Sequence, residues 1–205
     1  MNKNEFKSNK YWENRYNSGG NSGSGSYGKL AQFKADTINK FIKEEKIQNI
    51  VEFGCGDGNN LSLYSINSYI GIDVSNKAIK ICKSKFKNDL SKKFFTLSEF
   101  KMQENSNKNA ELILSLDVIY HLIEDEVYNE YMELLFNTSS KYIIIYASNY
   151  NEEFCTHVKH RKFTNWIKEN KKNWSLKNFI KNIYKYDSKN PTETTFADFY
   201  IFERD

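Results

Sequence analysis

The stretch VEFGCGDG, residues 51–58, joins an apolar run to three glycines at alternate positions. Because glycine weakens strands and helices, this cluster indicates a tight turn from a strand to a helix that lets a ligand approach the main chain closely. The β-branched run before it, residues 47–53 (IQNIVEF), predicts a buried strand. A similar run, residues 68–74 (SYIGIDV), reaches Asp73, about twenty residues beyond Glu52, where a carboxylate can accept hydrogen bonds from two ribose hydroxyls.

Strand and helix patterns alternate along the rest of the chain. Apolar residues fall near one helical face within residues 29–45, and Ser75 stands where it can cap a helix over residues 76–86. Helical patterns also cover residues 127–135 and residues 163–168, the latter with Thr164 as a candidate cap. The remaining strand patterns cover residues 93–97, 111–118, 141–147 and 195–202, and an apolar segment, residues 179–184, is expected to pair antiparallel with the last of them.

This alternation predicts an α/β fold: a doubly wound, mostly parallel seven-stranded sheet with helices on both faces and a C-terminal antiparallel hairpin. Ligands of such sheets bind beyond the carboxyl ends of the strands. The length of 205 residues predicts one domain, residues 1–205.

Composition excludes several classes of protein. Three cysteines lie far apart, which argues against a disulfide framework, a zinc site or any other metal centre. The net charge is only +4 with scattered lysines, so no nucleic-acid partner is expected. No apolar run approaches the roughly 20 residues of a membrane helix, and the polar start lacks a signal-type segment. We therefore expect a soluble, cytoplasmic protein with no membrane partner.

The spacing of the glycines separates two kinds of ligand. A dinucleotide site requires G-x-G-x-x-G, whereas residues 54–58 read G-x-G-x-G. Asp57 in that turn would also lie badly beside a pyrophosphate. An uncharged ribose with a zwitterionic tail suits the turn better, so a nicotinamide dehydrogenase is the weaker alternative.

The chain resembles the class I S-adenosylmethionine-dependent methyltransferases over nearly its whole length. VEFGCGDG resembles their glycine motif, YIGIDVS their ribose motif and LSLDVIYHLIEDEVY the segment after the fourth strand, and the last two strands resemble their antiparallel hairpin. The resemblance implies a Rossmann-like methyltransferase fold. It also implies an enzyme that uses S-adenosyl-L-methionine and releases S-adenosyl-L-homocysteine.

The resemblance also implies which residues hold the cofactor. The glycine turn passes under the methionine part, Glu52 organises that turn, Asn60 reaches the methionine carboxylate and Asp73 holds the ribose. Backbone groups near Ser115 and Leu116 meet the methionine amino group. Of the residues after the third strand, Ser98 and Glu99 lie nearest to the place of the usual adenine-binding acid. The predicted cofactor-binding residues are Glu52, Gly54, Cys55, Gly56, Asn60, Asp73, Val74, Ser115, Leu116, Tyr11 and Trp12.

The N-terminal segment, residues 1–28, is predicted to be a lid. Its Gly/Ser stretch, SGGNSGSGSYG, follows Tyr11, Trp12 and Tyr16, which are costly to leave in water. We expect these rings to pack over the cofactor cleft and the loop amides to form an anion-binding nest. The alternative is a mobile surface loop without ligand contact.

The arginines suggest the class of acceptor. The chain has only Arg15, Arg161 and Arg204, and a guanidinium suits phosphate or carboxylate better than the ammonium of lysine. Arg161 lies in HVKHRKF, which can instead be a solvated basic helix entrance. The hypothesis is a small anionic acceptor, and the predicted substrate-binding residues are Arg15, Ser24, Ser26, Tyr27, Lys159, His160 and Arg161.

His121 is the leading candidate for the polar group that faces the methyl group, as an acceptor ligand or base, with Tyr120 and His157 as alternatives and a structural role also open. The favoured function is O-methylation of a phosphate, phosphoramidate or sugar-phosphate acceptor, because the chain resembles small bacterial methyltransferases of surface and capsular polysaccharide modification. An RNA or protein methyltransferase and a catalytically silent cofactor-binding protein are the alternatives.

Overall fold

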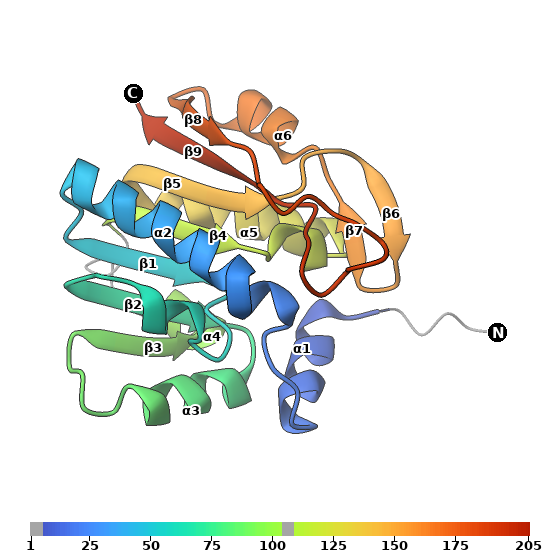
Figure 1. Ribbon diagram of the computed structural model, residues 1–205. Coiled ribbons are helices and arrows are strands. Elements are labelled where there is room, and N and C mark those ends of the chain that lie inside the picture. The colour runs from blue at the N-terminus through green and yellow to red at the C-terminus, as the bar shows by residue number, and fades with distance from the viewer. Residues whose placement is uncertain (1–5, 104–108) are drawn as a thin grey trace.

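The computed structural model describes residues 6–103 and 109–205. A seven-stranded sheet with strand order β3-β2-β1-β4-β5-β9-β8 crosses the molecule (Figure 1). Its strands are β1 (Asn49–Phe53), β2 (Ser68–Asp73), β3 (Lys92–Thr96), β4 (Ala110–Leu116), β5 (Ser139–Ala147), β8 (Trp174–Ile180) and β9 (Asp198–Arg204). The five strands from β1 to β5 pair in parallel, whereas β9 pairs antiparallel with both β5 and β8. The predicted α/β architecture with its C-terminal antiparallel strands is confirmed.

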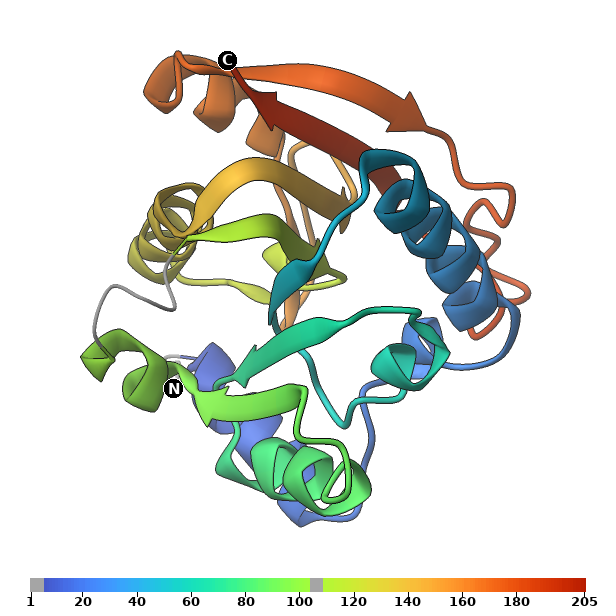
Figure 2. The same cartoon turned by 90° about the vertical axis from the view of Figure 1, so that its left-hand side faces the viewer.

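Helices cover both faces of this sheet (Figure 2). One core cluster joins α2 (Gly28–Glu45) and α3 (Asn76–Lys85) to side chains such as Ile144 on β5. The other joins α4 (Leu97–Met102), α5 (Asp125–Thr138) and α6 (Phe163–Asn170) to the next residue of that strand, Ile145. Since successive side chains of a strand point to opposite faces, buried strands with apolar residues at every position hold both layers.

Of the two helix caps predicted from the sequence, one is present in the structure and the other is not. Ser75 caps α3, because its hydroxyl accepts a hydrogen bond from the Ala78 amide at 3.1 Å. Thr164 is not a cap: α6 begins at Phe163 after Lys162, and the Thr164 amide and hydroxyl both donate to the Asn149 side-chain oxygen. The Thr164 prediction was therefore wrong.

Three segments differ from the sequence prediction. The glycine turn is followed by a single 3-10 turn, η2 (Asn60–Leu63), instead of a full helix. The antiparallel partner of β9 is Trp174–Ile180, so it begins earlier than the apolar segment 179–184. A two-stranded hairpin of β6 (Glu152–Cys155) and β7 (Val158–His160) was not predicted at all. Its strands are short, and their residues are largely polar and mostly exposed.

The N-terminal residues 8–26 lie beyond the carboxyl ends of the strands (Figure 1). They form α1 (Ser8–Asn17) and, after a loop, the short turn η1 (Ser24–Ser26) that leads into α2. Within the described parts of the chain, no helix combines the length and apolar character required to cross a membrane.

Candidate active site

A cavity of about 710 Å³ lies beyond the carboxyl ends of the parallel strands. Its lining comes from α1 and the Gly/Ser loop, from the ends of β1, β2 and β4, from the hairpin and from residues 186–196. This is the place where doubly wound sheets bind their ligands. The cavity joins segments that are far apart in sequence.

The glycine turn forms the floor of the cavity and is pressed against the Gly/Ser loop. Gly54 and Gly56 both have positive φ, 82° and 57°. A Cβ atom on Gly56 would come within 2.2 Å of the Ser22 hydroxyl and within 2.9 Å of the Tyr16 hydroxyl. Only glycine allows this approach, so the turn presents bare backbone to the cavity.

Asp73 closes the turn at the end of β2. One carboxylate oxygen accepts the Gly56 amide at 3.0 Å and the other accepts the Ser75 amide at 2.9 Å. Burial raises the pKa of Asp73 to about 6, although hydrogen bonds from the Ser75 and Gly56 amides oppose this effect. The carboxylate lines the cavity with both oxygens oriented by the backbone.

Asp57 anchors the Gly/Ser loop to the glycine turn. Its carboxylate accepts hydrogen bonds from the Ser22 amide at 3.1 Å and the Tyr27 hydroxyl at 2.6 Å, and the Asp57 amide donates back to the Ser22 hydroxyl. Burial acts to raise the pKa of Asp57, but hydrogen bonds led by the one from Tyr27 hold it below the ordinary value. Asp57, which would lie badly beside a pyrophosphate, therefore fastens the Gly/Ser loop to the glycine turn.

Aromatic residues of α1 pack on two histidines at the cavity. Tyr11 stacks on His157 with ring centroids 5.1 Å apart, and His157 stacks on His121 at 5.9 Å. Trp12 meets the edge of His121 at 5.0 Å. The predicted packing of the N-terminal rings over the cleft is seen in these contacts.

His121 is neutral and has a defined tautomer. Its Nδ1 lies 2.9 Å from the His157 carbonyl oxygen, which can only accept, so Nδ1 carries the hydrogen and Nε2 has the free lone pair. Burial lowers the pKa of His121 to about 4, with opposing contributions from the His157 carbonyl and the Asp117 charge. At neutral pH the side chain is thus a hydrogen-bond acceptor at Nε2.

Lys34 and Asp117 form an ion pair that sequence reasoning missed. The Lys34 side chain is fully buried, and its ammonium lies 2.6 Å from one Asp117 oxygen. The other oxygen accepts the Tyr120 hydroxyl at 2.6 Å, and Asp117 has a positive φ of 61°. The signal was present: Lys34 falls on the apolar face of α2, one turn after Leu30 and one turn before Ile38.

Tyr120 and Glu52 have structural partners that limit their chemistry. Burial raises the pKa of the Tyr120 hydroxyl well above its ordinary value, so Tyr120 is a hydrogen-bond donor to Asp117 and unsuited as a base. Glu52 accepts the Tyr69 hydroxyl at 2.6 Å, and burial raises its pKa to about 7. Glu52 does not line the cavity, and its carboxylate is bound by the Tyr69 hydroxyl.

A protein-family model described as a methyltransferase domain matches residues 27–183, well over half of the chain. The chain belongs to this methyltransferase family. No curated protein sequence matches the chain.

Solved structures of similar fold include three methyltransferases. The methyltransferase domain of bacterial CtHen1-C has 19% identity, with 83% of this chain and 96% of that chain covered and a TM-score of 0.64. Magnesium protoporphyrin IX methyltransferase from Synechocystis PCC 6803 with bound SAM has 14% identity, coverage of 98% and 99%, and a TM-score of 0.67. N-methyltransferase NodS from Bradyrhizobium japonicum WM9 in complex with S-adenosyl-L-homocysteine has 12% identity, coverage of 85% and 87%, and a TM-score of 0.65. At these identities the likeness concerns the fold alone.

The methyl donor of this methyltransferase is S-adenosyl-L-methionine, and the described residues fit that cofactor. Asp73 is a buried acceptor at the position expected for the ribose, and Gly54 and Gly56 line the same cavity. The Asn60 Oδ1 atom is buried beside the cavity without a hydrogen-bond partner among the described residues. Such an atom requires a hydrogen-bond donor, which a bound ligand would supply.

Most of the residues predicted from the sequence meet at this cavity. The predicted cofactor and catalytic residues that line it are Tyr11, Trp12, Gly54, Cys55, Gly56, Asn60, Asp73, Val74, Leu116, Tyr120, His121 and His157. Arg15, Ser24 and Ser26 of the predicted substrate set line it as well. Tyr27 is directed to Asp57, and the Ser115 hydroxyl is paired with the Tyr131 hydroxyl, so neither side chain reaches the cavity.

The residues expected nearest to the adenine-binding position, Ser98 and Glu99, do not reach the cavity. Glu99 is occupied by the capping box of α4, where its carboxylate accepts the Thr96 amide at 2.6 Å. Neither Ser98 nor Glu99 lines the cavity, whereas Leu97 and Lys101 of the same helix do. An acidic contact to adenine from this helix is therefore not supported.

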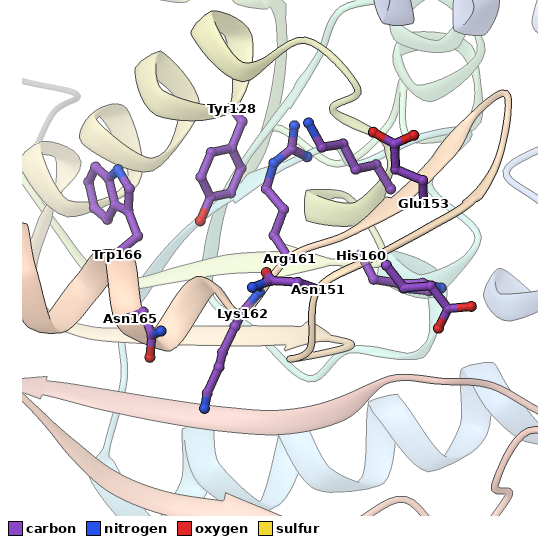
Figure 3. Close-up of a pocket in the computed structure, with 10 residues that line it drawn as sticks. Tyr128, Asn151, Glu153, His160, Arg161, Lys162, Asn165 and Trp166 are labelled. Atoms are coloured by element: carbon purple, nitrogen blue, oxygen red, sulfur yellow. Dashed lines mark hydrogen bonds between the residues drawn. The ribbon is translucent and has the colours of Figure 1, made fainter.

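Lys159, His160 and Arg161 lie at a different pocket. This pocket, about 530 Å³, is bordered by the hairpin, α5 and α6 (Figure 3). The Arg161 guanidinium is buried and donates to the Leu122 and Ile123 carbonyl oxygens and to the Asp125 carboxylate. Because these partners satisfy the guanidinium, Arg161 fastens the hairpin to the start of α5 and is not free for an acceptor in the cavity.

Proposed function

We propose that this methyltransferase methylates a hydroxyl group of a small acceptor that also carries an anionic group. The observation that carries the proposal is the neutral His121, whose Nδ1 is bound to the His157 carbonyl oxygen. The remaining Nε2 lone pair is suited to receive the hydrogen of a hydroxyl acceptor. His121 lines the same cavity as the cofactor residues Asp73 and Gly56.

The chain contributes positioning and proton management. S-Adenosylmethionine supplies, when bound, an electrophilic methyl group on a sulfonium. His121 Nε2 holds and accepts the hydroxyl proton of the acceptor, and the nearby Asp117 charge favours the resulting imidazolium. Asp117 itself is held by Lys34 and Tyr120. The lid, fastened by Asp57, excludes water and orients the acceptor for an in-line displacement.

Arg15 is the cation that this proposal assigns to the anionic group. Its Nε donates to the Asn21 carbonyl oxygen at 2.7 Å, whereas its two terminal nitrogens have no hydrogen-bond partner among the described residues. Arg15 lines the cavity, and its guanidinium lies 5.8 Å from the centre of the Trp12 ring, which packs on His121. Phosphate, phosphoramidate and sugar-phosphate acceptors of capsular polysaccharide synthesis, suggested by the sequence resemblance, belong to this class.

The test is a labelled-methyl assay with S-adenosylmethionine and a panel of acceptors, comprising hydroxy acids, sugar phosphates, their uncharged analogues and RNA. We expect methylation of anionic hydroxyl acceptors, with a Michaelis constant at least about tenfold higher in Arg15→Gln, since a charged hydrogen bond contributes roughly 1.5–3 kcal/mol. Arg204→Gln is the control, because Arg204 lies over Trp174 and contacts the Ser139 carbonyl oxygen away from the cavity. Equal use of uncharged analogues, or activity on RNA alone, would contradict the proposal.

A further inference from the structure

The acceptor side of the cavity has a lining of aromatic rings, and we infer that it is a stacking subsite for the ring of a hydroxylated aromatic acid. This inference rests on the proposed function and narrows the acceptor from any small anion to an aryl one. Four features carry it: the exposed rings, their arrangement, the engagement of neighbouring hydroxyl groups by the protein, and two polar side chains of matching chemistry.

Three rings from two separate segments form the first part of the subsite. Phe154 of β6 and Tyr186 and Phe196 of the C-terminal loop all line the cavity. Phe196 stacks on Tyr186 with centroids 3.8 Å apart and meets Phe154 at 5.1 Å. Phe154 and Tyr186 nevertheless remain 46% and 36% exposed, so ring surface is left uncovered at the cavity. Uncovered aromatic surface in a concave site is typical of a subsite for an apolar, ring-shaped ligand.

A second set of rings lies at the same cavity. Tyr11, His157 and His121 form a stacked series with interplanar angles of 16° and 10°. Such a series presents flat faces and edges, which prefer another aromatic ring at centroid distances of 4.5–7 Å. The catalytic candidate His121 is itself a member of this series, so a ring held here lies beside the group that receives the proton.

Several polar groups that line the cavity are already engaged. The Thr194 hydroxyl donates to the Asn190 carbonyl oxygen and accepts the Asp187 amide, and the Thr195 hydroxyl accepts the Ala197 amide. The Tyr120 hydroxyl is bound to Asp117. A sugar needs a separate partner for each hydroxyl, because unpaired buried polar groups are costly. A planar aromatic ring has no such requirement, which favours it over a sugar.

Two polar side chains at the cavity match an aromatic acid. Arg15 has free terminal guanidinium nitrogens for a carboxylate or phosphate, and His121 Nε2 is an acceptor for one phenolic hydroxyl. A phenol is also easier to deprotonate than a sugar hydroxyl, since its pKa is about 10. A weakly basic imidazole with a pKa of about 4 is therefore better matched to a phenolic acceptor.

The experiment measures the affinity of 4-hydroxybenzoate and 4-hydroxyphenyl phosphate by calorimetry with S-adenosyl-L-homocysteine present, against glucose 6-phosphate and 3-hydroxypropionate. Phe154→Leu removes a ring, and Phe179→Leu is its matched control, because Phe179 is 45% exposed on β8 and outside the cavity lining. We expect the two aryl acids to bind, with affinity about three- to tenfold weaker in Phe154→Leu and unchanged in Phe179→Leu.

Each outcome decides between this inference and the proposed function. No binding of either aryl acid, tighter binding of glucose 6-phosphate, or equal affinities in the two variants overturns the aromatic subsite. If glucose 6-phosphate or 3-hydroxypropionate is methylated in an Arg15-dependent reaction, the proposed function stands and the aromatic subsite falls. If 4-hydroxybenzoate binds in a Phe154-dependent way but no hydroxyl acceptor is methylated, the subsite stands and the proposed O-methylation falls.

Discussion

Lys34 and Asp117, 83 positions apart in the sequence, join helix α2 to the end of strand β4 through a 2.6 Å ion pair beside the cavity. The Lys34 side chain is completely buried, while 17% of the Asp117 side chain is exposed. The lysine therefore lies behind the carboxylate, which contacts the cavity. An ideal Cβ on Gly25 would lie 3.0 Å from the same carboxylate, so the Gly/Ser loop packs closely against this pair.

Removing one partner of this pair should destabilise the protein strongly. Asp117→Asn keeps a residue that tolerates positive φ but leaves a buried ammonium without a counterion, and we expect a loss of about 3 kcal/mol in the free energy of unfolding. The double variant Lys34→Met/Asp117→Asn should recover part of this loss. Urea denaturation measures both. The exposed pair of Lys40 and Glu44 is the control, since Lys40→Met should change stability by less than about 0.5 kcal/mol; equal effects at the two pairs would refute the prediction.

Asp57 should govern the protection of the Gly/Ser loop. Asp57→Ala removes the acceptor of the Ser22 amide and the Tyr27 hydroxyl, so amide exchange in residues 18–27 should become at least about tenfold faster. Hydrogen-exchange mass spectrometry measures this, with Asp89→Ala, at an exposed carboxylate, as the control. Because the pKa of Asp57 is lowered in the folded protein, its contribution is present above the unfolded pKa of about 3.9 and is lost as the pH falls through the lower folded value. Loop protection that disappears already between pH 7 and 5 would show that another group holds the lid.

Cofactor binding should weaken on acidification through Asp73. The raised pKa of about 6 means that the carboxylate becomes protonated below pH 6 and then accepts ribose hydroxyls less well. Calorimetric titration with S-adenosylmethionine should show affinity falling below pH 6, and Asp73→Asn should bind weakly with no such pH dependence. Glu52, whose pKa is about 7, is tested separately with Glu52→Gln, which should keep the transition near pH 6. Protonation of Asp73 has the opposite effect on the free energy of unfolding. It relieves an unfavourable buried charge, so the contribution of Asp73 to stability rises as the pH falls from about 6 toward 4.

Two substitutions separate the nitrogens of His121. His121→Asn retains a donor for the His157 carbonyl oxygen and removes Nε2, and it should lower kcat by a factor of about 10² to 10⁴ if Nε2 accepts the proton. His121→Gln tests the reverse arrangement, in which a polar group is kept at the Nε2 position and the Nδ1 donor is removed. His157→Phe is the control, because His157 contacts His121 through its backbone oxygen and ring face, both of which phenylalanine keeps. Rates measured from pH 8 to 5.5 should show no titration of His121, whose pKa is about 4. Full activity of His121→Asn would leave His121 with a structural role only.

Much of the fold was predictable because its signals are local. β-Branched runs such as residues 47–53 and 141–147 have the periodicity of buried strands, and the alternate glycines after Glu52 require a turn. Asp73 was predictable for the same reason, since it is the last residue of a strand that neighbours β1 in the sheet. The hairpin β6–β7 escaped prediction because its exposed residues carry no apolar alternation and its stability comes from tertiary contacts such as those of Arg161.

The sequence by itself determined the layered α/β fold, the glycine turn and the acidic residue at the end of the second strand, because each depends on residues within a few positions of one another. Only the tertiary structure decided that Asp57 holds the lid, that Lys34 neutralises Asp117, and that Arg161 is directed inward to main-chain oxygens whereas Arg15 lines the cavity. Arg15 and Arg161 are the same residue type, so the sequence did not distinguish them as anion-binding candidates. Burial and pairing with partners distant in the sequence distinguish them in the structure. Long-range contacts of this kind are set by how the helices and loops pack on the sheet, which no local pattern records.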